Sequence, residues 1–204
     1  MREVLPFFSK VFSFNQFNIS DEQVKFVISE IDKISFQKWD REEPSSTSLA
    51  SNNKYFLDQK QLNFLKQLIV QDFNNYTKEV FKWDNHFKMT TSWIAKVEPG
   101  KNSHWHNHNN CMYSGILYLQ TDEKTGRIIF NQFDLKRFQL EPTEWNDYNS
   151  DELYVQPKNK TIIYFPAEIF HKIEENKSNL TRYSLAFNFV PTGVIGQGDS
   201  QVII

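Results

Sequence analysis

The stretch FKMTTSWIAKVEPG, residues 87–100, marks the point at which the chain changes from helical to strand periodicity. Every second residue from Phe87 to Val97 reads Phe, Met, Thr, Trp, Ala and Val. A period of two predicts a β-strand, and these six residues are expected to share one of its faces. Pro99-Gly100 is a turn signal that ends the strand.

Upstream of this strand, the apolar residues recur at helical spacing. Ser20 and Gln23 form a capping box before an apolar series that runs to Ile34. Asp58 and Gln61 give a second capping signal before a longer series, residues 62–83. A polar stretch, residues 41–54, separates the two predicted helices and reads as a loop.

Downstream, only short strand-like segments follow, and turn-forming residues separate them. They are residues 114–120, 127–133, 152–155, 160–165 and 182–190. Because no helical pattern lies between them, βαβ units are excluded and an antiparallel sandwich or barrel is expected, with the helices bracing one sheet. We therefore expect one domain over residues 1–204, with a helical part (1–86), a β core (87–193) and a tail (194–204).

Composition excludes several functional classes. The 23 basic and 25 acidic residues give a net charge of −2 and are mixed along the chain, which argues against nucleic-acid partners and against binding to anionic membranes. No apolar run approaches the length of about 20 residues that a transmembrane helix needs. The single cysteine, Cys111, excludes an internal disulfide, so a reducing, cytoplasmic location is expected.

The run HWHNH, residues 104–108, is the strongest local signal for chemistry. Residues two apart on an extended strand point the same way and lie roughly 6.5–7 Å apart, so two imidazoles can converge on one ion. Both His104 with His106 and His106 with His108 satisfy this spacing, and imidazole suits iron, zinc, copper or nickel. The alternative is a polar loop with solvated histidines.

Two later segments supply further candidates. His171 follows the apolar stretch TIIYF, residues 161–165, and is expected at a strand end or at the start of the next strand. In the stretch 182–190, Arg182, Ser184 and Asn188 share one face with a small alanine. A guanidinium beside a hydroxyl suits a small carboxylate. The alternatives are an ordinary packed or surface histidine and a solvent-facing polar strand.

The order of these blocks resembles a known enzyme family. His-x-His is followed by SGILYL (114–119), GRIIF (126–130), Phe165-Pro with His171, and Arg182-x-Ser184. This order is similar to that of the 2-oxoglutarate/Fe(II) oxygenases of phages and bacteria, which are relatives of the prolyl hydroxylases. The resemblance covers residues 89–193, about half of the chain.

The resemblance implies a fold, cofactors and site residues. The core would be a double-stranded β-helix, a cupin-like jelly roll braced by two or three helices. Fe(II) would be bound by His106, His108 and His171. 2-Oxoglutarate would be held by Arg182 and Ser184, with Tyr118 and Asn188 as further pocket residues. The other partners would be dioxygen and an unidentified peptide or small-molecule substrate, with a prolyl or other peptide side chain as the first expectation.

One feature departs from the wider family, whose metal triad has two histidines and one carboxylate. Here the carboxylate position is His108, which leaves the metal with more net positive charge. Two other functions stay open: a cupin-type metalloenzyme that does not use 2-oxoglutarate, and an inactive binding module. The apolar tail, Val202-Ile-Ile204, is expected to cover an edge strand or a second copy in a homodimer.

Overall fold

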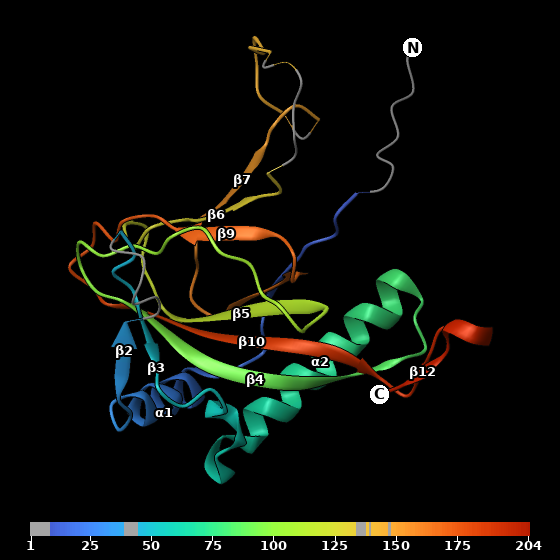
Figure 1. Ribbon diagram of the computed structural model, residues 1–204. Helices are drawn as coiled ribbons and strands as arrows, with labels where there is room; N and C mark the ends of the chain where they lie inside the picture. Colours follow the sequence, from blue (N-terminus) through green and yellow to red (C-terminus); the bar gives the residue numbers. More distant parts are fainter. Residues whose placement is uncertain (1–8, 39–44, 134–137, 139, 147) are drawn as a thin grey trace.

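Two facing antiparallel sheets form the centre of the computed structural model, which describes residues 9–38, 45–133, 138, 140–146 and 148–204. The large sheet has the strand order β1-β8-β5-β10-β4-β3-β2, and the small sheet has the order β7-β6-β9 (Figure 1). The strands are β1 (Ser13–Gln16), β2 (Phe36–Lys38), β3 (Leu49–Ser51), β4 (His86–Val97), β5 (Tyr113–Gln120), β6 (Ile128–Asn131), β7 (Glu152–Val155), β8 (Thr161–Pro166), β9 (Phe170–Ile173) and β10 (Arg182–Thr192).

The arrangement is that of a jelly roll. Strands β6 and β9 lie across from β5 and β10 in Figure 1, and every pair of neighbouring strands is antiparallel. An apolar cluster that includes Ile116, Ile163 and Phe130 brings together residues of both sheets. The predicted fold class, mainly β with bracing helices, is confirmed.

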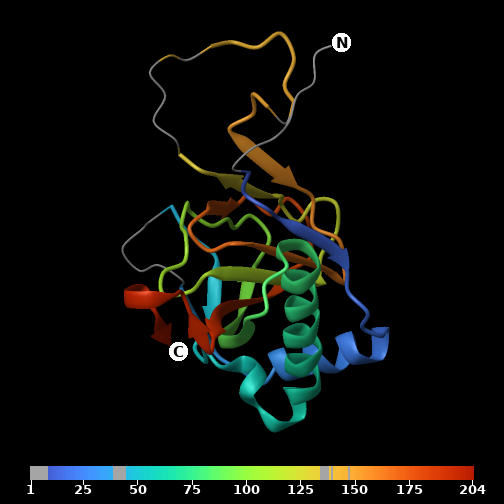
Figure 2. The same cartoon turned by 90° about the vertical axis from the view of Figure 1, so that its right-hand side faces the viewer.

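Two α-helices cover the outer face of the large sheet (Figure 2): α1 (Asp21–Ile31) and α2 (Asn63–Phe81). The predicted capping box is present at α1, where Ser20 and Gln23 bond reciprocally. The second capping prediction is wrong. Two 3₁₀ turns, η1 (Phe56–Asp58) and η2 (Lys60–Leu62), precede α2, and Asp58 instead pairs with Lys66 at 2.5 Å. Among the described residues, no helix has both the length and the apolar character needed to span a bilayer.

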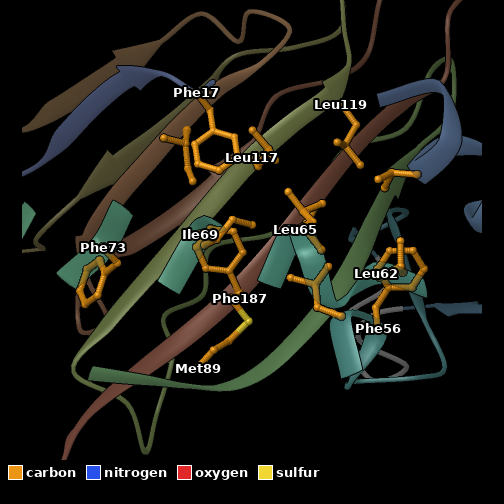
Figure 3. Close-up of a cluster of buried hydrophobic side chains, with 14 of the residues drawn as sticks. Phe17, Phe56, Leu62, Leu65, Ile69, Phe73, Met89, Leu117, Leu119 and Phe187 are labelled. Atoms are coloured by element: carbon orange, nitrogen blue, oxygen red, sulfur yellow. The ribbon is translucent and has the colours of Figure 1, made fainter. Parts of the chain in front are cut away.

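The main core lies between α2 and the large sheet (Figure 3). Its aromatic rings pack edge to face and face to face. Phe73 of α2 is fully buried and stacks on Phe189 with ring centroids 4.1 Å apart. Its edge also meets Phe87 and Tyr164, at 5.2 and 5.0 Å. A small residue is required on β5, since a Cβ at Gly115 would lie 2.2 Å from the Phe187 ring.

The expectation of a single face from Phe87 to Val97 is wrong, because β4 contains a bulge. Asn188 of β10 pairs with Thr91, whereas the next residue, Phe189, pairs with Met89. One extra residue on β4 reverses the alternation of its side chains. Phe87 and Met89 therefore pack into the core under α2, whereas Trp93 lies on the opposite face, toward the space between the sheets.

The part expected to be helical, residues 1–86, also contributes strands β1, β2 and β3 to the large sheet. Strand β3 lies within the polar stretch 41–54 that reads as a loop; residues 41–44 of that stretch lie outside the described residues. The tail forms a separate hairpin of β11 (Val194–Ile195) and β12 (Val202–Ile203) around η3 (Gly198–Ser200). It therefore adds no strand to either larger sheet.

We expect Phe73→Ala to lower the free energy of unfolding by about 3–5 kcal/mol, because it removes a buried ring and leaves a cavity among the remaining rings. Val80→Ala on the same helix is the matched control; Val80 is 51% exposed, so its loss should change stability by no more than about 0.5 kcal/mol. Urea unfolding followed by circular dichroism measures both. Similar values for the two variants would contradict this description of the core.

Candidate metal centre

The first histidine segment and His171 are joined through the backbone. The His106 amide donates to the His171 carbonyl at 3.0 Å, and the His171 amide donates back to the His106 carbonyl at 2.8 Å. This short antiparallel bridge lays the HWHNH segment along β9, as an additional strand would lie. The two imidazole rings are consequently held side by side, with centroids 4.3 Å apart.

His108 is positioned by a second backbone contact, from its amide to the carbonyl of Ala167 at 2.9 Å. Its Nε2 lies 3.4 Å from Nε2 of His171. The ligating nitrogens of His106, His108 and His171 all lie within 4.8 Å of one another. Two imidazoles bound to one ion at right angles, with metal–nitrogen distances of about 2.1 Å, would place their nitrogens about 3.0 Å apart. The donor set therefore fits a metal ion.

Hydrogen bonds to carbonyl groups orient two of the rings. Nδ1 of His106 lies 3.0 Å from the His104 carbonyl, and Nδ1 of His171 lies 3.2 Å from the Ile169 carbonyl. A carbonyl oxygen can only accept, so each Nδ1 carries the proton, and each Nε2 presents a lone pair. His104 contributes its backbone carbonyl to this arrangement and lies outside the ligand group.

The electrostatic surroundings keep the imidazoles of His108 and His171 neutral. Burial, assisted by the neighbouring His106, lowers the pKa of His108 to about 3. Burial also holds the pKa of His171 well below its ordinary value. A metal ligand must be unprotonated, so the lowered pKa values favour metal binding. Within the described part of the chain no carboxylate belongs to this group, and Glu98 instead pairs with Lys96 at 2.7 Å.

The three histidines open onto a cavity between the two sheets, with an empty volume of about 590 Å³ that includes open solvent at its mouth. Its walls are largely apolar, and Trp93, Ile116 and Phe165 contribute to them. Strand β3 adds Ala50, so part of the wall comes from the N-terminal part of the chain. The sequence gives no sign of this contribution, because β3 is only three residues long and lies within a polar stretch.

Arg182 lines the same cavity and is fully buried, so the solvent-facing alternative for its strand is wrong. Its Nε donates to the Ser184 hydroxyl at 3.2 Å, and its Nη1 donates to the Gly126 carbonyl at 2.9 Å. Among the described residues, Nη2 has no hydrogen-bond partner. Burial lowers the pKa of Arg182, but an arginine stays charged in a protein.

Tyr118 lies beside this arginine, with the guanidinium carbon 5.0 Å from its ring centroid. The sequence leaves open on which side of its strand Tyr118 lies; the structure places it between the sheets, completely buried. Its hydroxyl is likewise without a hydrogen-bond partner in the described part of the chain. A buried cation and a buried hydroxyl therefore both lack a partner at one place.

Asn188 lies farther along β10, and both ends of its amide are engaged. Its Oδ1 accepts from the Ser114 hydroxyl at 2.8 Å, and its Nδ2 donates to Thr91 Oγ1 at 3.1 Å. These bonds form a polar row across three neighbouring strands. Of the three residues, Ser114 lines the cavity. Asn188 therefore positions Ser114, a residue of the cavity wall. Its predicted contact with 2-oxoglutarate stays a prediction.

Comparison with known proteins places this architecture among metal-dependent oxygenases. The family described as "Putative 2OG-Fe(II) oxygenase" matches residues 91–188. No curated protein matches the chain in sequence. The solved structures with similar folds are about 10–16% identical, so they bear on the fold alone.

Three of these structures illustrate the similarity. SnoK, a non-heme α-ketoglutarate-dependent carbocyclase from nogalamycin biosynthesis, has a TM-score of 0.68 at 11% identity, over 94% of this chain and 84% of that one. HygX of Streptomyces hygroscopicus, solved with nickel, 2-oxoglutarate and hygromycin B, has a TM-score of 0.62 at 11% identity, over 89% of this chain and 83% of that one. A Pseudomonas putida prolyl-4-hydroxylase has a TM-score of 0.58 at 16% identity, over 89% of this chain and 93% of that one.

A jelly roll with three converging histidines defines the class of β-helix proteins with a candidate metal centre. More particularly, residues 91–188 belong to the 2OG-Fe(II) oxygenase family, a family of oxidoreductases. The cofactors are those of the family, Fe(II) and 2-oxoglutarate.

We expect His106→Ala, His108→Ala and His171→Ala each to weaken metal binding by more than about a hundredfold, since each removes a converging nitrogen. His104→Ala is the matched control and should cost less than about tenfold, because alanine retains the carbonyl that orients His106. Metal content after anaerobic loading with Fe(II) and dialysis measures the difference. An equal loss in all four variants would contradict the three-histidine centre.

Proposed function

We propose that this protein is an Fe(II)- and 2-oxoglutarate-dependent dioxygenase that hydroxylates a prolyl or other side chain of a peptide. In this proposal His106, His108 and His171 bind the metal. Arg182 and Ser184 bind the far carboxylate of 2-oxoglutarate, and Tyr118 lies beside that carboxylate.

The observation that carries the proposal is the buried Arg182 guanidinium, which shares one cavity with the three histidines. No acidic side chain pairs with it in the described part of the chain: its bonds go to a hydroxyl and a carbonyl, and Nη2 makes none. A buried charge without a counter-charge is costly, and such a cost is retained where a ligand supplies the missing partner. A carboxylate that reaches Nη2 and the Tyr118 hydroxyl would satisfy both groups.

The distribution of polar groups fits a ligand with two different ends. The cavity is lined both by imidazole nitrogens that can bind a metal and by a buried guanidinium that can pair with a carboxylate. When bound, iron and 2-oxoglutarate supply oxidising power: dioxygen adds one oxygen atom to a substrate C–H bond, and the second leaves in succinate, with release of carbon dioxide. The chain itself binds, orients and shields these reactants.

Apolar walls are the chain's contribution to shielding. Trp93 and Phe165 lie near the histidines, and the ring of Trp93 is 5.4 Å from that of His108. Such walls exclude bulk water and strengthen the electrostatic interactions within the cavity. With three neutral ligands, the bound metal keeps its full positive charge, which favours the dianionic 2-oxoglutarate.

We further propose that residues 1–204 work as one domain. The N-terminal strands extend the sheet that carries the site, and β3 forms part of the cavity wall, which supports this view. A reducing, cytoplasmic location would keep Cys111 as the free thiol that it is here.

The deciding experiment is an anaerobic titration of the Fe(II)-loaded protein with 2-oxoglutarate. A visible charge-transfer band should appear as the keto acid chelates the metal. If iron is bound and no band forms, the cupin-type function that does not use 2-oxoglutarate replaces this proposal. If no metal binds, the protein is a binding module.

Arg182→Met tests the carboxylate site separately from folding. Because methionine fills much of the same space without a buried charge, we expect unchanged or higher thermal stability, with a loss of 2-oxoglutarate affinity of at least about a hundredfold. Arg127→Met is the matched control; this arginine is half exposed, pairs with Glu174, and should leave affinity unchanged. Equal affinity in the Arg182→Met protein would place the carboxylate elsewhere.

A further inference from the structure

The connection between β6 and β7 spans residues 132–151, and its described residues 138, 140–146 and 148–151 stand away from the body of the molecule (Figures 1 and 2). We call it the aromatic arm, because its described residues expose large apolar side chains. Phe138, Trp145 and Tyr148 are 78%, 61% and 70% exposed. Leu140, at 82%, is exposed as well. Large apolar side chains gathered on one exposed segment mark an interaction site.

The arm is rooted beside the metal centre. The ring of Phe133 packs edge-on against Trp105 at 5.0 Å and against Phe170 at 5.3 Å. These two residues directly precede His106 and His171 in the chain. Phe133 also has a φ of 54°, in the left-handed region that a bulky residue rarely adopts. Its amide is held there by the Asn131 side chain.

The far end of the arm is an organised turn. Asn146 receives a hydrogen bond from the Tyr148 amide at 2.8 Å, and Asn149 both accepts from the Asn146 amide and donates to the Glu144 carbonyl at 2.8 Å. Because amide side chains satisfy the backbone, the turn forms without burying Trp145 or Tyr148. Both rings are thereby presented to solvent.

The arm is acidic on balance: residues 132–151 contain the five acidic residues Asp134, Glu141, Glu144, Asp147 and Asp151 and the two basic residues Lys136 and Arg137. Around Trp145 and Tyr148, from residue 139 to residue 155, the sequence contains no Lys or Arg. At the root of the arm, a cationic side chain of this protein already contacts both an aromatic ring and a carboxylate. Arg127 lies over Tyr154 at 4.5 Å and pairs with Glu174 at 2.7 Å. Lys172 likewise lies over Trp105 at 4.6 Å.

We propose that the aromatic arm binds a cationic polypeptide, whose Lys or Arg side chains lie over Trp145 and Tyr148 and pair with the nearby carboxylates. Aromatic faces attract cations, and the acidic surroundings add charge complementarity. Trp145 and Tyr148 lie at the far end of the arm, whereas its root packs on Trp105 and Phe170, which directly precede His106 and His171. The arm therefore connects the proposed binding surface to the two segments that carry these histidines. That this polypeptide is the substrate rests on the proposed function; that it binds the arm does not.

Binding is tested with a fluorescein-labelled peptide of alternating Lys and Pro, against one of alternating Glu and Pro, by fluorescence anisotropy on the full chain without iron or 2-oxoglutarate. We expect the lysine peptide to bind and the glutamate peptide to bind at least about tenfold more weakly. The affinity for the lysine peptide should also fall as salt is raised.

Two pairs of variants locate the binding surface. Trp145→Ala with Tyr148→Ala should weaken lysine-peptide binding about tenfold, whereas Tyr55→Ala, at an exposed ring elsewhere, should not. Glu141→Gln with Glu144→Gln should weaken binding and reduce its salt dependence. Glu79→Gln with Asp199→Asn, two exposed acidic residues elsewhere, removes the same net charge and should have little effect.

Equal affinity for the two peptides, or unchanged binding by both arm variants, overturns the proposal. A second result would also overturn the proposal. If the wild-type protein sediments as a dimer and the double variant Trp145→Ala with Tyr148→Ala sediments as a monomer, a second copy of the chain occupies the arm. The 2-oxoglutarate titration is read separately. Absence of its absorption band removes the proposed function and leaves peptide binding standing, whereas loss of peptide selectivity with the band intact removes only the role of the arm.

Discussion

The central position of β10 between β4 and β5 is the constraint on which the rest of the structure depends. Strand β10 pairs with both neighbours along most of its length, so its alternating side chains must serve two different environments. Leu185, Phe187 and Phe189 pack into the core under α2, whereas Arg182 and Ser184 face the cavity. Stability and chemistry are thus divided between the two faces of one strand, and a shift of register by one residue would exchange them.

This division explains why the sequence predicts the β half well. The alternation from Arg182 to Val190 is unambiguous, and it places the arginine correctly on the face opposite the aromatic core. The spacing within the run HWHNH predicts a converging pair of histidines, and the family resemblance, not the spacing, selects His106 with His108 over His104 with His106. Local patterns succeed here because each residue's environment follows from its position on the strand.

The failures arise where contacts between distant segments override local patterns. The bulge in β4 leaves Thr90 as an extra residue in the pairing with β10. The alternation of residues in the β4 sequence gives no indication of this bulge. The 3₁₀ turns before α2 replace the expected cap because Phe56, Leu57 and Leu62 are drawn into the core. Strands β1, β2 and β3 are too short to show a period, and the partners of β1 and β3 in the large sheet lie far away in the chain. Pairing across long sequence separations cannot be read from a local window.

The candidate metal centre and Arg182 have one electrostatic feature in common. In both, buried polar atoms lack some of their hydrogen-bond or charge partners, and hydrogen bonds from neighbouring groups hold them in place. The His106–His171 backbone bridge sets the distance between two imidazoles, while burial keeps the imidazoles of His108 and His171 neutral. The Gly126 carbonyl and Ser184 satisfy part of the guanidinium and fix its direction, while one nitrogen stays available. Complete satisfaction by an internal carboxylate would stabilise the empty protein and remove the reason for an anion to bind. The stability that the aromatic core provides under α2 therefore offsets the cost of these buried polar groups, which the proposed function assigns to the metal and to 2-oxoglutarate.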